Sequence, residues 1–368
     1  MLLTISWILI IAILILTILT LIYKVKLPKS IKIITIIVLG LALGYIAYST
    51  LPGPGDDLYR YNIILDEMGS LGKYFFEKYS YFGKVSIIEY YFFIFSNPAL
   101  KRFLPVVTVL IFYSILCYIF YKENKRLKKE DSVFNRNNIL MYLVLIVSCI
   151  FFRKVISSIR YFLAFAILVL AFYRDYIEKK SNIVTIVLYI ISGLLHYCVI
   201  PFIAIRIIFN KKLKLLKYKW IVVVMPVIVM FILKSNIFSN IPLLSTVINK
   251  FKYYSSNQTV DIRLLFLQIV LWFVLFIWTK KTLKENLENT EKEYIQFYQI
   301  MLIMMITFLF VPEFFTRYFE LMCILSFPLL TKIKLNKGDY TIPIFYISTI
   351  LIFSYQIVDI LNNWNFIK

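Results

Sequence analysis

The sequence predicts an all-α integral membrane protein, a polytopic helical bundle. Of its 368 residues 61% are hydrophobic, and the mean hydropathy is +0.80. Many apolar runs approach the ~20 residues that a helix needs to cross a bilayer, which predicts about 12 spans. Because no polar stretch is longer than a loop, we expect one integral membrane domain over residues 1–368 and no separate soluble domain.

The positive charge of the chain is sorted along the sequence and orients the helices. The net charge of +21 comes mainly from lysines in short loops between apolar runs. The positive-inside rule assigns these loops to the cytoplasm, so the charge is a topology signal and gives no support to nucleic-acid binding. The predicted cytoplasmic loops are 24–31, 122–137, 175–181, 210–218, 281–293 and 332–340.

The predicted spans follow from this orientation, with both termini outside. The N-terminus lacks a basic region and a small-residue cleavage site, so we interpret residues 2–23 as a retained helix, not a signal peptide. The two long external segments are residues 52–98 and 236–261, both rich in aromatic residues. The spans in order are 2–23, 32–51, 99–121, 138–152, 155–174, 182–195, 198–209, 219–235, 262–280, 294–311, 317–331 and 341–359.

One stretch inside the first external segment, residues 86–95, is apolar and aromatic and contains Glu89. At about ten residues it is too short to cross the bilayer. We therefore expect a short interfacial or re-entrant helix there.

Residues 182–209 allow two interpretations. A single long helix would invert the later topology and put lysine-rich loops outside, against the charge rule. A hairpin that turns at His196 keeps them inside, with Pro201 limiting regular helix just beyond the turn. Each arm of about 14 residues is roughly 21 Å long, against a hydrocarbon core of about 30 Å. His196 should then lie below the outer headgroups, beside protein or a water-filled cavity.

The outward ends of the predicted spans carry the candidate functional residues. The turn at residues 52–55 presents two adjacent carboxylates, Asp56 and Asp57. Arg153, Ser157 and Arg160 fall on one helical stripe, at i, i+4 and i+7. Two guanidinium groups on one stripe can bind phosphate or carboxylate oxygens. The alternative for Arg160 is a side chain that reaches the interface or an internal salt bridge.

Arg317 repeats this pattern near the start of a late span. Glu313 and Glu320 share its face, so its charge is either available for an anion or neutralised by these glutamates. His196, the only histidine, either handles protons or is a hydrogen-bonding packing residue. The four cysteines lie in apolar runs without CxxC spacing, so neither a disulfide nor a metal site is indicated.

In order and spacing, these positions resemble the Wzy-type oligosaccharide repeat-unit polymerases, specifically their EpsG-like branch. The resemblance covers roughly residues 30–330. The chain departs from the family at two places. The family often has Asp-Thr where this chain has Asp56-Asp57, and a small residue where Tyr197 follows His196. The matching segments are Gly55-Asp56-Asp57 with Tyr59 and Tyr61, Glu89-Tyr90-Tyr91, Ser158-Ile159-Arg160-Tyr161-Phe162-Leu163-Ala164, His196-Tyr197 and Arg317-Tyr318.

The resemblance implies a membrane glycosyltransferase of capsule or exopolysaccharide assembly, with its active site facing outward. Such enzymes move a growing glycan from undecaprenyl pyrophosphate onto a new lipid-linked repeat unit, and need no metal, nucleotide sugar or other cofactor. The implied partners are this lipid-linked oligosaccharide, membrane lipid, and the flippase and chain-length regulator of the same pathway.

We hypothesise that cationic side chains hold the pyrophosphate while one of three groups activates the acceptor hydroxyl. The candidates for activation are His196, Asp57 and Asp56. The candidates for pyrophosphate or glycan binding are Arg160, Arg153, Arg317, Arg60 and Arg263.

Two other classes of protein fit the same features. One is a different lipid-linked glycan transferase, either O-antigen ligase-like or a C-type glycosyltransferase, although the large soluble domain that usually accompanies the latter is absent from this sequence. The other is a flippase or transporter of lipid-linked repeat units. Transporters commonly show two repeated halves, and the sequence shows no such symmetry.

Overall fold

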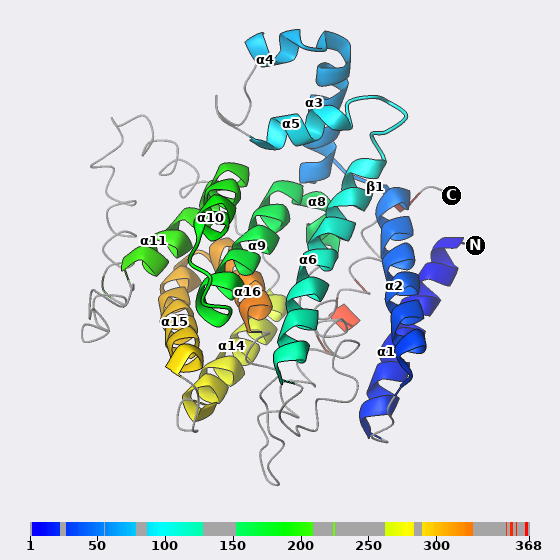
Figure 1. The fold of residues 1–368 in the computed structure, drawn as a ribbon. Coiled ribbons are helices and arrows are strands. Elements are labelled where there is room, and N and C mark those ends of the chain that lie inside the picture. The colour runs from blue at the N-terminus through cyan, green and yellow to red at the C-terminus, as the bar shows by residue number, and fades with distance from the viewer. Residues whose placement is uncertain are drawn as a thin grey trace. The chain divides into compact units, whose positions relative to one another are not determined.

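The structure, a computed structural model, is built from α-helices and confirms the all-α class (Figure 1). It describes residues 2–22, 27–54, 56–78, 87–127, 152–208, 224, 262–282, 289–326, 351, 354–355, 358 and 365–366. The chain folds into two compact units. Unit 1 comprises Met1–Ile200, Leu330–Asn336 and Phe353–Lys368, and unit 2 comprises Pro201–Leu329 and Lys337–Ile352.

Three long helices form one side of unit 1: α1 (Leu2–Ile22), α2 (Lys29–Ser49) and α6 (Phe103–Leu127). α2 packs between the other two. A Cβ atom added to Gly40 would lie 3.9 Å from Leu110, and one added to Gly44 would lie 3.5 Å from Val106. The later glycine of α2 meets the earlier residue of α6, so the two helices are antiparallel. Small residues four apart allow their backbones to approach closely, as in membrane helix pairs.

The core helix of unit 1 is α9 (Ile159–Phe172), which is buried around most of its circumference. A helix that is apolar on all sides is stable only when other helices cover it. α9 follows the short helix α8 (Phe152–Ser157) and continues as a π-helical turn, η2 (Tyr173–Ile177). It packs against α6 and against α10 (Ile183–Leu195). The Ser192 hydroxyl on α10 donates a hydrogen bond of 3.0 Å to the Ala164 carbonyl, which sets the register of these two helices.

A layer of shorter helices covers one end of unit 1 (Figure 1). It consists of α3 (Asp57–Leu71), α4 (Tyr74–Lys78) and α5 (Ile87–Ile94). The eight residues of α5 confirm the short helix expected at residues 86–95. One side of α5 is buried, including Glu89, while Ile87, Tyr90 and Ile94 are exposed along the other. An apolar exposed stripe suits the interfacial position that the sequence predicts.

Two glycines allow α3 to pack closely against the end of α5. A Cβ atom on Gly69 would lie 2.7 Å from the Ser96 carbonyl oxygen, closer than real side chains come. Gly72, the residue that ends α3, has φ +57° and ψ −133°, a conformation that side chains disfavour. Both positions therefore need glycine, and together they place α3 against the end of α5.

Among the described residues, the strands are limited to one antiparallel pair of two residues each. β1 (Thr50–Leu51) leads from α2 toward α3 and pairs with β2 (Asn365–Phe366) near the end of the chain. The C-terminal segment is thereby joined to the end of unit 1 that carries α3.

Lysines of α2, of α6 and of the segment after η2 lie at the end of unit 1 opposite the acidic turn. α2 begins at Lys29 and ends just before β1, and the antiparallel helix α6 ends beyond Lys122. Lys179 and Lys180 follow the far end of α9. The acidic turn and Arg160 lie at the other end, next to α3. The charge rule predicts that this lysine-bearing end faces the cytoplasm.

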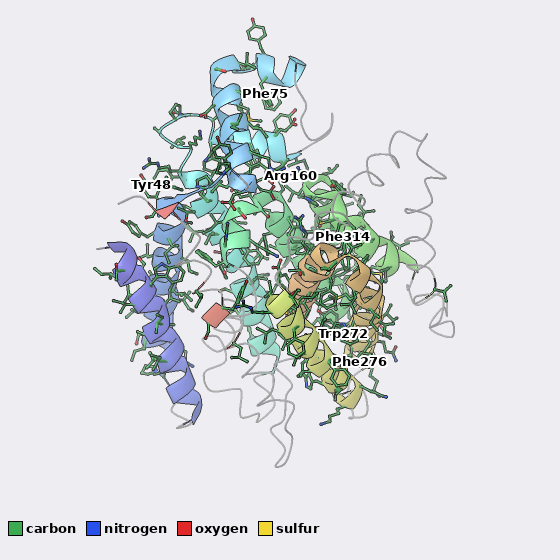
Figure 2. All side chains as sticks on the ribbon, turned by 180° about the vertical axis from the view of Figure 1, so that it is seen from behind. Tyr48, Phe75, Arg160, Trp272, Phe276 and Phe314 are labelled. Carbon is green, nitrogen blue, oxygen red and sulfur yellow. The ribbon has the colours of Figure 1, made fainter. Side chains whose placement is uncertain are left out.

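Unit 2 contains most of α11 (Ile200–Ile208), together with α14 (Ile262–Thr282), α15 (Asn289–Met305), the 3₁₀ turn η6 (Ile306–Phe310) and α16 (Pro312–Leu325). Side-chain donors bond to carbonyls of neighbouring helices: Trp272 to Leu302 at 3.0 Å and Tyr298 to Met322 at 2.9 Å. The indole of Trp272 also stacks on Phe276 along α14 (Figure 2). These bonds satisfy polar groups inside an apolar bundle.

Two described helices are long and apolar enough to cross a membrane, Ser30–Ser49 and Ile262–Lys281, and four shorter apolar helices accompany them. These helices fit a membrane protein, and about 12 spans remain a prediction. Predicted spans 138–152, 219–235 and 341–359, and the external segment 236–261, lie almost wholly outside the described residues. The predicted span 155–174 is wrong in detail, because α8 and α9 meet at a break at Ser158.

Candidate functional site

The acidic turn predicted from the sequence is closed by its own backbone and by a side chain. The Asp56 N–H donates to the Gly53 carbonyl at 2.9 Å, and the Gly53 N–H donates to Asp56 Oδ2 at 2.9 Å. Asp56 is the residue before α3, and Asp57 lies in the first turn of that helix. A carboxylate at this position interacts favourably with the helix dipole. The two acidic side chains are therefore presented side by side at the start of α3.

Each aspartate contacts a different part of the α8–α9 segment. Asp56 Oδ1 accepts a hydrogen bond of 3.2 Å from Arg153 on α8, in an ion pair whose side chains are only partly exposed. Asp57 Oδ2 accepts one of 3.1 Å from the Ser158 hydroxyl, and its other oxygen pairs with Arg60. The partners are 97 and 101 residues apart in the chain. The two carboxylates thus connect the start of α3 to the α8–α9 segment in the core of unit 1.

The predicted stripe of Arg153, Ser157 and Arg160 is interrupted, which corrects the expectation of one continuous helix. Ser158 has φ −96° and ψ 53°, so Arg153 belongs to α8 and Arg160 to the first turn of α9. Serine is common at the start of a helix because its hydroxyl can cap the backbone. Here that hydroxyl bonds to Asp57 instead. Ser158 is thus a site residue that helical periodicity did not identify.

Arg160 lies near both the acidic turn, which carries Asp57, and the residues that follow His196. Its guanidinium lies close enough to the Asp57 carboxylate of α3 for an electrostatic interaction, and Tyr61, Tyr197 and Cys198 lie in the same neighbourhood. Figure 2 shows Arg160 at the end of α9 next to the α3–α5 layer. Arginine keeps its charge when water is removed and offers a planar set of donors. This side chain is therefore suited to bind an anion inside the bundle.

His196 lies at a break between α10 and the 3₁₀ turn η3 (Tyr197–Val199), which confirms the predicted interruption at this residue. Its backbone is extended, and its Nδ1 accepts a hydrogen bond of 3.2 Å from the Cys198 N–H. The imidazole stacks on Tyr197 with ring centres 4.8 Å apart, and Tyr161 approaches it edge-on at 5.7 Å. Because Tyr161 follows Arg160 in the chain, the histidine ring lies beside the arginine-bearing turn of α9.

The interpretation of Pro201 as a limit to regular helix is wrong. Pro201 is the second residue of α11, which runs regularly to Ile208. Proline is tolerated in the first turn of a helix, where its missing N–H would have no helical partner. Reversal of direction between α10 and α11, the other part of the hairpin interpretation, stays a prediction.

A small pocket opens beside the Asp56–Arg153 pair. Its volume of about 10 Å³ is close to the space that one water molecule needs. The acidic turn, β1 and α8 all contribute to its wall, so charged and apolar surfaces meet there. The lining residues are Thr50, Leu51, Pro52, Asp56, Leu58, Arg153, Ile156 and Ser157.

The remaining two predicted arginines belong to unit 2. Arg263 is exposed at the second residue of α14. Arg317 lies in the second turn of α16, where the next residue, Tyr318, contacts Phe308 and Phe314. One turn further, Glu320 is fully buried. The structure brings Asp56, Asp57, Arg60, Arg153, Arg160 and His196 together within unit 1, and joint action of Arg160 with Arg317 stays a prediction.

In the part of the chain that the structure describes, no group of three or more His, Cys, Asp or Glu side chains is placed to hold a metal ion. None of the described cysteines, Cys117, Cys198 and Cys323, is in a disulfide bond. The expectation of a reaction without metal stays a prediction.

Comparisons with known proteins give one match. The model of the EpsG family matches residues 33–367. No curated protein and no solved structure matches the chain. The matched range includes the acidic turn, Arg160, His196 and Arg317, the segments on which the sequence-based resemblance rests.

Proposed function

Because the chain belongs to the EpsG family, we propose that it polymerises oligosaccharide repeat units linked to undecaprenyl pyrophosphate. Membership confirms the resemblance predicted from the sequence and indicates a polymerase of exopolysaccharide synthesis in general. The specific substrate, the capsular or extracellular product and the outer face of the cell membrane as the site of reaction are our proposal.

The observation that carries the proposal is the cluster of charges at the end of unit 1 that carries α3. Arg160 and Arg153 lie beside two carboxylates there, at the helix ends nearest the acidic turn. A pyrophosphate leaving group carries several negative charges, and fixed guanidinium groups stabilise such charge as it develops. A site at a helix end near the membrane surface suits a substrate whose lipid part remains in the bilayer.

In the proposed reaction, an acceptor hydroxyl of one repeat unit attacks the anomeric carbon that links another glycan to pyrophosphate. The new glycosidic bond forms as the bond from carbon to the pyrophosphate oxygen breaks. The electron pair leaves with undecaprenyl pyrophosphate, and the hydroxyl proton passes to a base on the protein. Asp57 and His196 are both candidates for this base.

The two aspartates have different surroundings, which suggests different roles. Asp56 bonds to Arg153 through one oxygen and to the N–H that closes the turn through the other. We assign Asp56 to holding Arg153 in place. Asp57 interacts with Arg160 as well as with Ser158 and Arg60, so it lies closer to the group expected to bind pyrophosphate. We therefore favour Asp57 over Asp56 as the residue that activates the acceptor.

Reconstitution of the purified protein with a defined undecaprenyl-linked repeat unit, followed by sizing of the products, tests the proposal. A ladder of repeat units is expected. A single added unit would indicate a ligase-like or C-type transferase instead. Movement of the substrate across the bilayer without a new glycosidic bond would indicate a flippase.

A pair of arginine variants links the activity to the site. We expect long polymer to be lost with both Arg160→Ala and Arg160→Lys. Arg102→Ala is the matched control, since Arg102 is an exposed cation at the same end of unit 1, 6.0 Å from the Tyr48 ring centre. Wild-type polymer from both Arg160 variants would contradict the assignment of Arg160.

The proposed partners extend beyond the substrate. Membrane lipid surrounds the bundle, and the flippase and chain-length regulator of the same pathway would supply repeat units and set polymer length. Co-purification from membranes after mild crosslinking would test these two contacts.

A further inference from the structure

We propose that His196 acts as a neutral hydrogen-bond donor through Nε2–H and is not the base that activates the acceptor. The identity of the group that receives this hydrogen bond rests on the proposed function. The protonation pattern of the ring rests only on the geometry of unit 1.

The contact between His196 and Cys198 determines which ring nitrogen carries the proton. The backbone N–H of Cys198 donates to Nδ1 at 3.2 Å. An N–H group cannot donate to a nitrogen that itself carries a hydrogen, because both atoms would then be donors. Nδ1 must therefore be unprotonated, and in a neutral imidazole the proton is on Nε2.

Several contacts hold the ring in this orientation. Tyr197 covers it with an interplanar angle of 23°, and the edge of Tyr161 approaches at 87°. The His196 backbone N–H donates to the Ser192 carbonyl at 3.1 Å, and Ser192 is itself bonded to α9. Moving the proton to Nδ1 would break the bond to Cys198 and disturb the start of η3. The fold therefore favours one tautomer.

This tautomer is suited to donation and not to proton abstraction. A base needs a free electron pair aimed at the acceptor hydroxyl, and the free pair of His196 is occupied by the Cys198 N–H. Nε2–H can instead donate to an oxygen of the pyrophosphate as negative charge develops there, beside the Arg160 guanidinium. No proton needs to leave the imidazole in this role. The acceptor proton then passes to the Asp57 carboxylate, while the carbon–oxygen bond to pyrophosphate breaks and its electrons leave with that group.

The sequence makes the tautomer directly measurable, because His196 is the only histidine in the chain. We would prepare the full-length protein with ¹⁵N-labelled histidine and an affinity tag that contains none, in lipid nanodiscs at neutral pH. The two ring nitrogens have distinct ¹⁵N shifts according to whether each is protonated. We expect a protonated Nε2 and an unprotonated Nδ1 that accepts a hydrogen bond. A proton on Nδ1 would overturn the proposal.

Two variants separate donation from positioning of the turn. His196→Gln keeps an N–H donor near the position of Nε2 but loses the acceptor for Cys198. His196→Asn keeps an acceptor near the position of Nδ1 but loses the distant donor. If donation from Nε2 matters, His196→Asn should lose about 10²–10³-fold in polymerisation rate, as when one preorganised donor is removed. His196→Gln should retain at least ten times the rate of His196→Asn.

Equal rates of the two variants, or a faster His196→Asn, would overturn the donor role. The folded fraction of each variant, measured by its thermal unfolding in the same nanodiscs, corrects the rates for loss of structure. The ¹⁵N experiment reports the tautomer whether or not the substrate is the one proposed. Failure of the proposed function would appear instead as wild-type protein that forms no polymer.

Discussion

Arg160 and Arg317 look alike in the sequence and differ in their surroundings. Each is followed by a tyrosine, and each lies in a 14-residue helix that begins after a break, α9 in unit 1 and α16 in unit 2. Arg160 interacts with the carboxylate of Asp57, and its neighbour Tyr161 contacts the histidine ring. Tyr318, the neighbour of Arg317, contacts Phe308 and Phe314.

An Arg-Tyr pair therefore does not by itself define a site. In α9 the arginine lies in the first turn, where residues of the acidic turn and of η3 can reach it. In α16 it lies in the second turn, and the adjacent tyrosine belongs to an aromatic cluster. The residues around each pair, not the pair itself, decide which arginine is near groups that can perform chemistry.

The largest expected effect separates the two arginines directly. Arg160→Lys should lower the polymerisation rate about 10²–10³-fold, because lysine cannot reproduce the planar donor set near Asp57. Arg317→Lys should lower it only about tenfold, as for a cation that contributes charge without a fixed fork. Rates in the reconstituted system measure both. Equal losses for the two variants would show that the comparison between them is mistaken.

A substitution in α3 that changes no charge should disturb the neighbourhood of Arg160 while leaving the Arg317 helix unchanged. In Gly69→Ala the new methyl group would meet the Ser96 carbonyl and push α3, with Asp57 at its start, away from its position. We expect a loss of about 1–3 kcal/mol in stability, typical of overpacking. Thermal unfolding in detergent measures it. Ser70→Ala, at the next and exposed position, is the control and should change stability by less than about 0.5 kcal/mol.

A smaller effect concerns the bond that holds Asp57 near α9. Ser158→Ala removes the hydroxyl that donates to Asp57, at a cost of about 1 kcal/mol. Since Asp57 is then held less well relative to Arg160, the polymerisation rate should fall about fivefold, in line with that free energy. Ser158→Thr keeps the hydroxyl and should recover most of the rate. Identical rates for the alanine and threonine variants would remove Ser158 from the site.

The smallest expected effect concerns a hydrogen bond between α5 and α6. The hydroxyls of Tyr91 and Thr108 are hydrogen-bonded at 2.9 Å, and burial, only partly offset by this bond, raises the pKa of Tyr91 to about 12. The neutral phenol therefore contributes stability below pH about 10, the ordinary tyrosine value, and loses it as the pH rises through about 12. Tyr91→Phe should cost about 0.5–1 kcal/mol. Between these pH values the unfolding temperature should fall less for Tyr91→Phe than for wild type.

The sequence predicted the break at His196 but missed the break at Ser158, for different physical reasons. The short apolar arms on both sides of His196 and the lysines beyond them are local signals. At Ser158 the local pattern is compatible with uninterrupted helix, and the hydroxyl bonds to an aspartate 101 residues away. A partner so distant in the chain leaves no trace in the periodicity around the serine.

The helical class, the family resemblance and the lysine-rich loops follow from the sequence alone. These properties depend on the composition of each segment and on the cost of placing charge in hydrocarbon, which is the same wherever the segment packs. Which arginine pairs with which carboxylate, and which nitrogen of His196 accepts a hydrogen bond, depends on the tertiary structure. Such pairings depend on the positions of α3, α9 and η3 relative to one another, which packing of distant segments within unit 1 establishes.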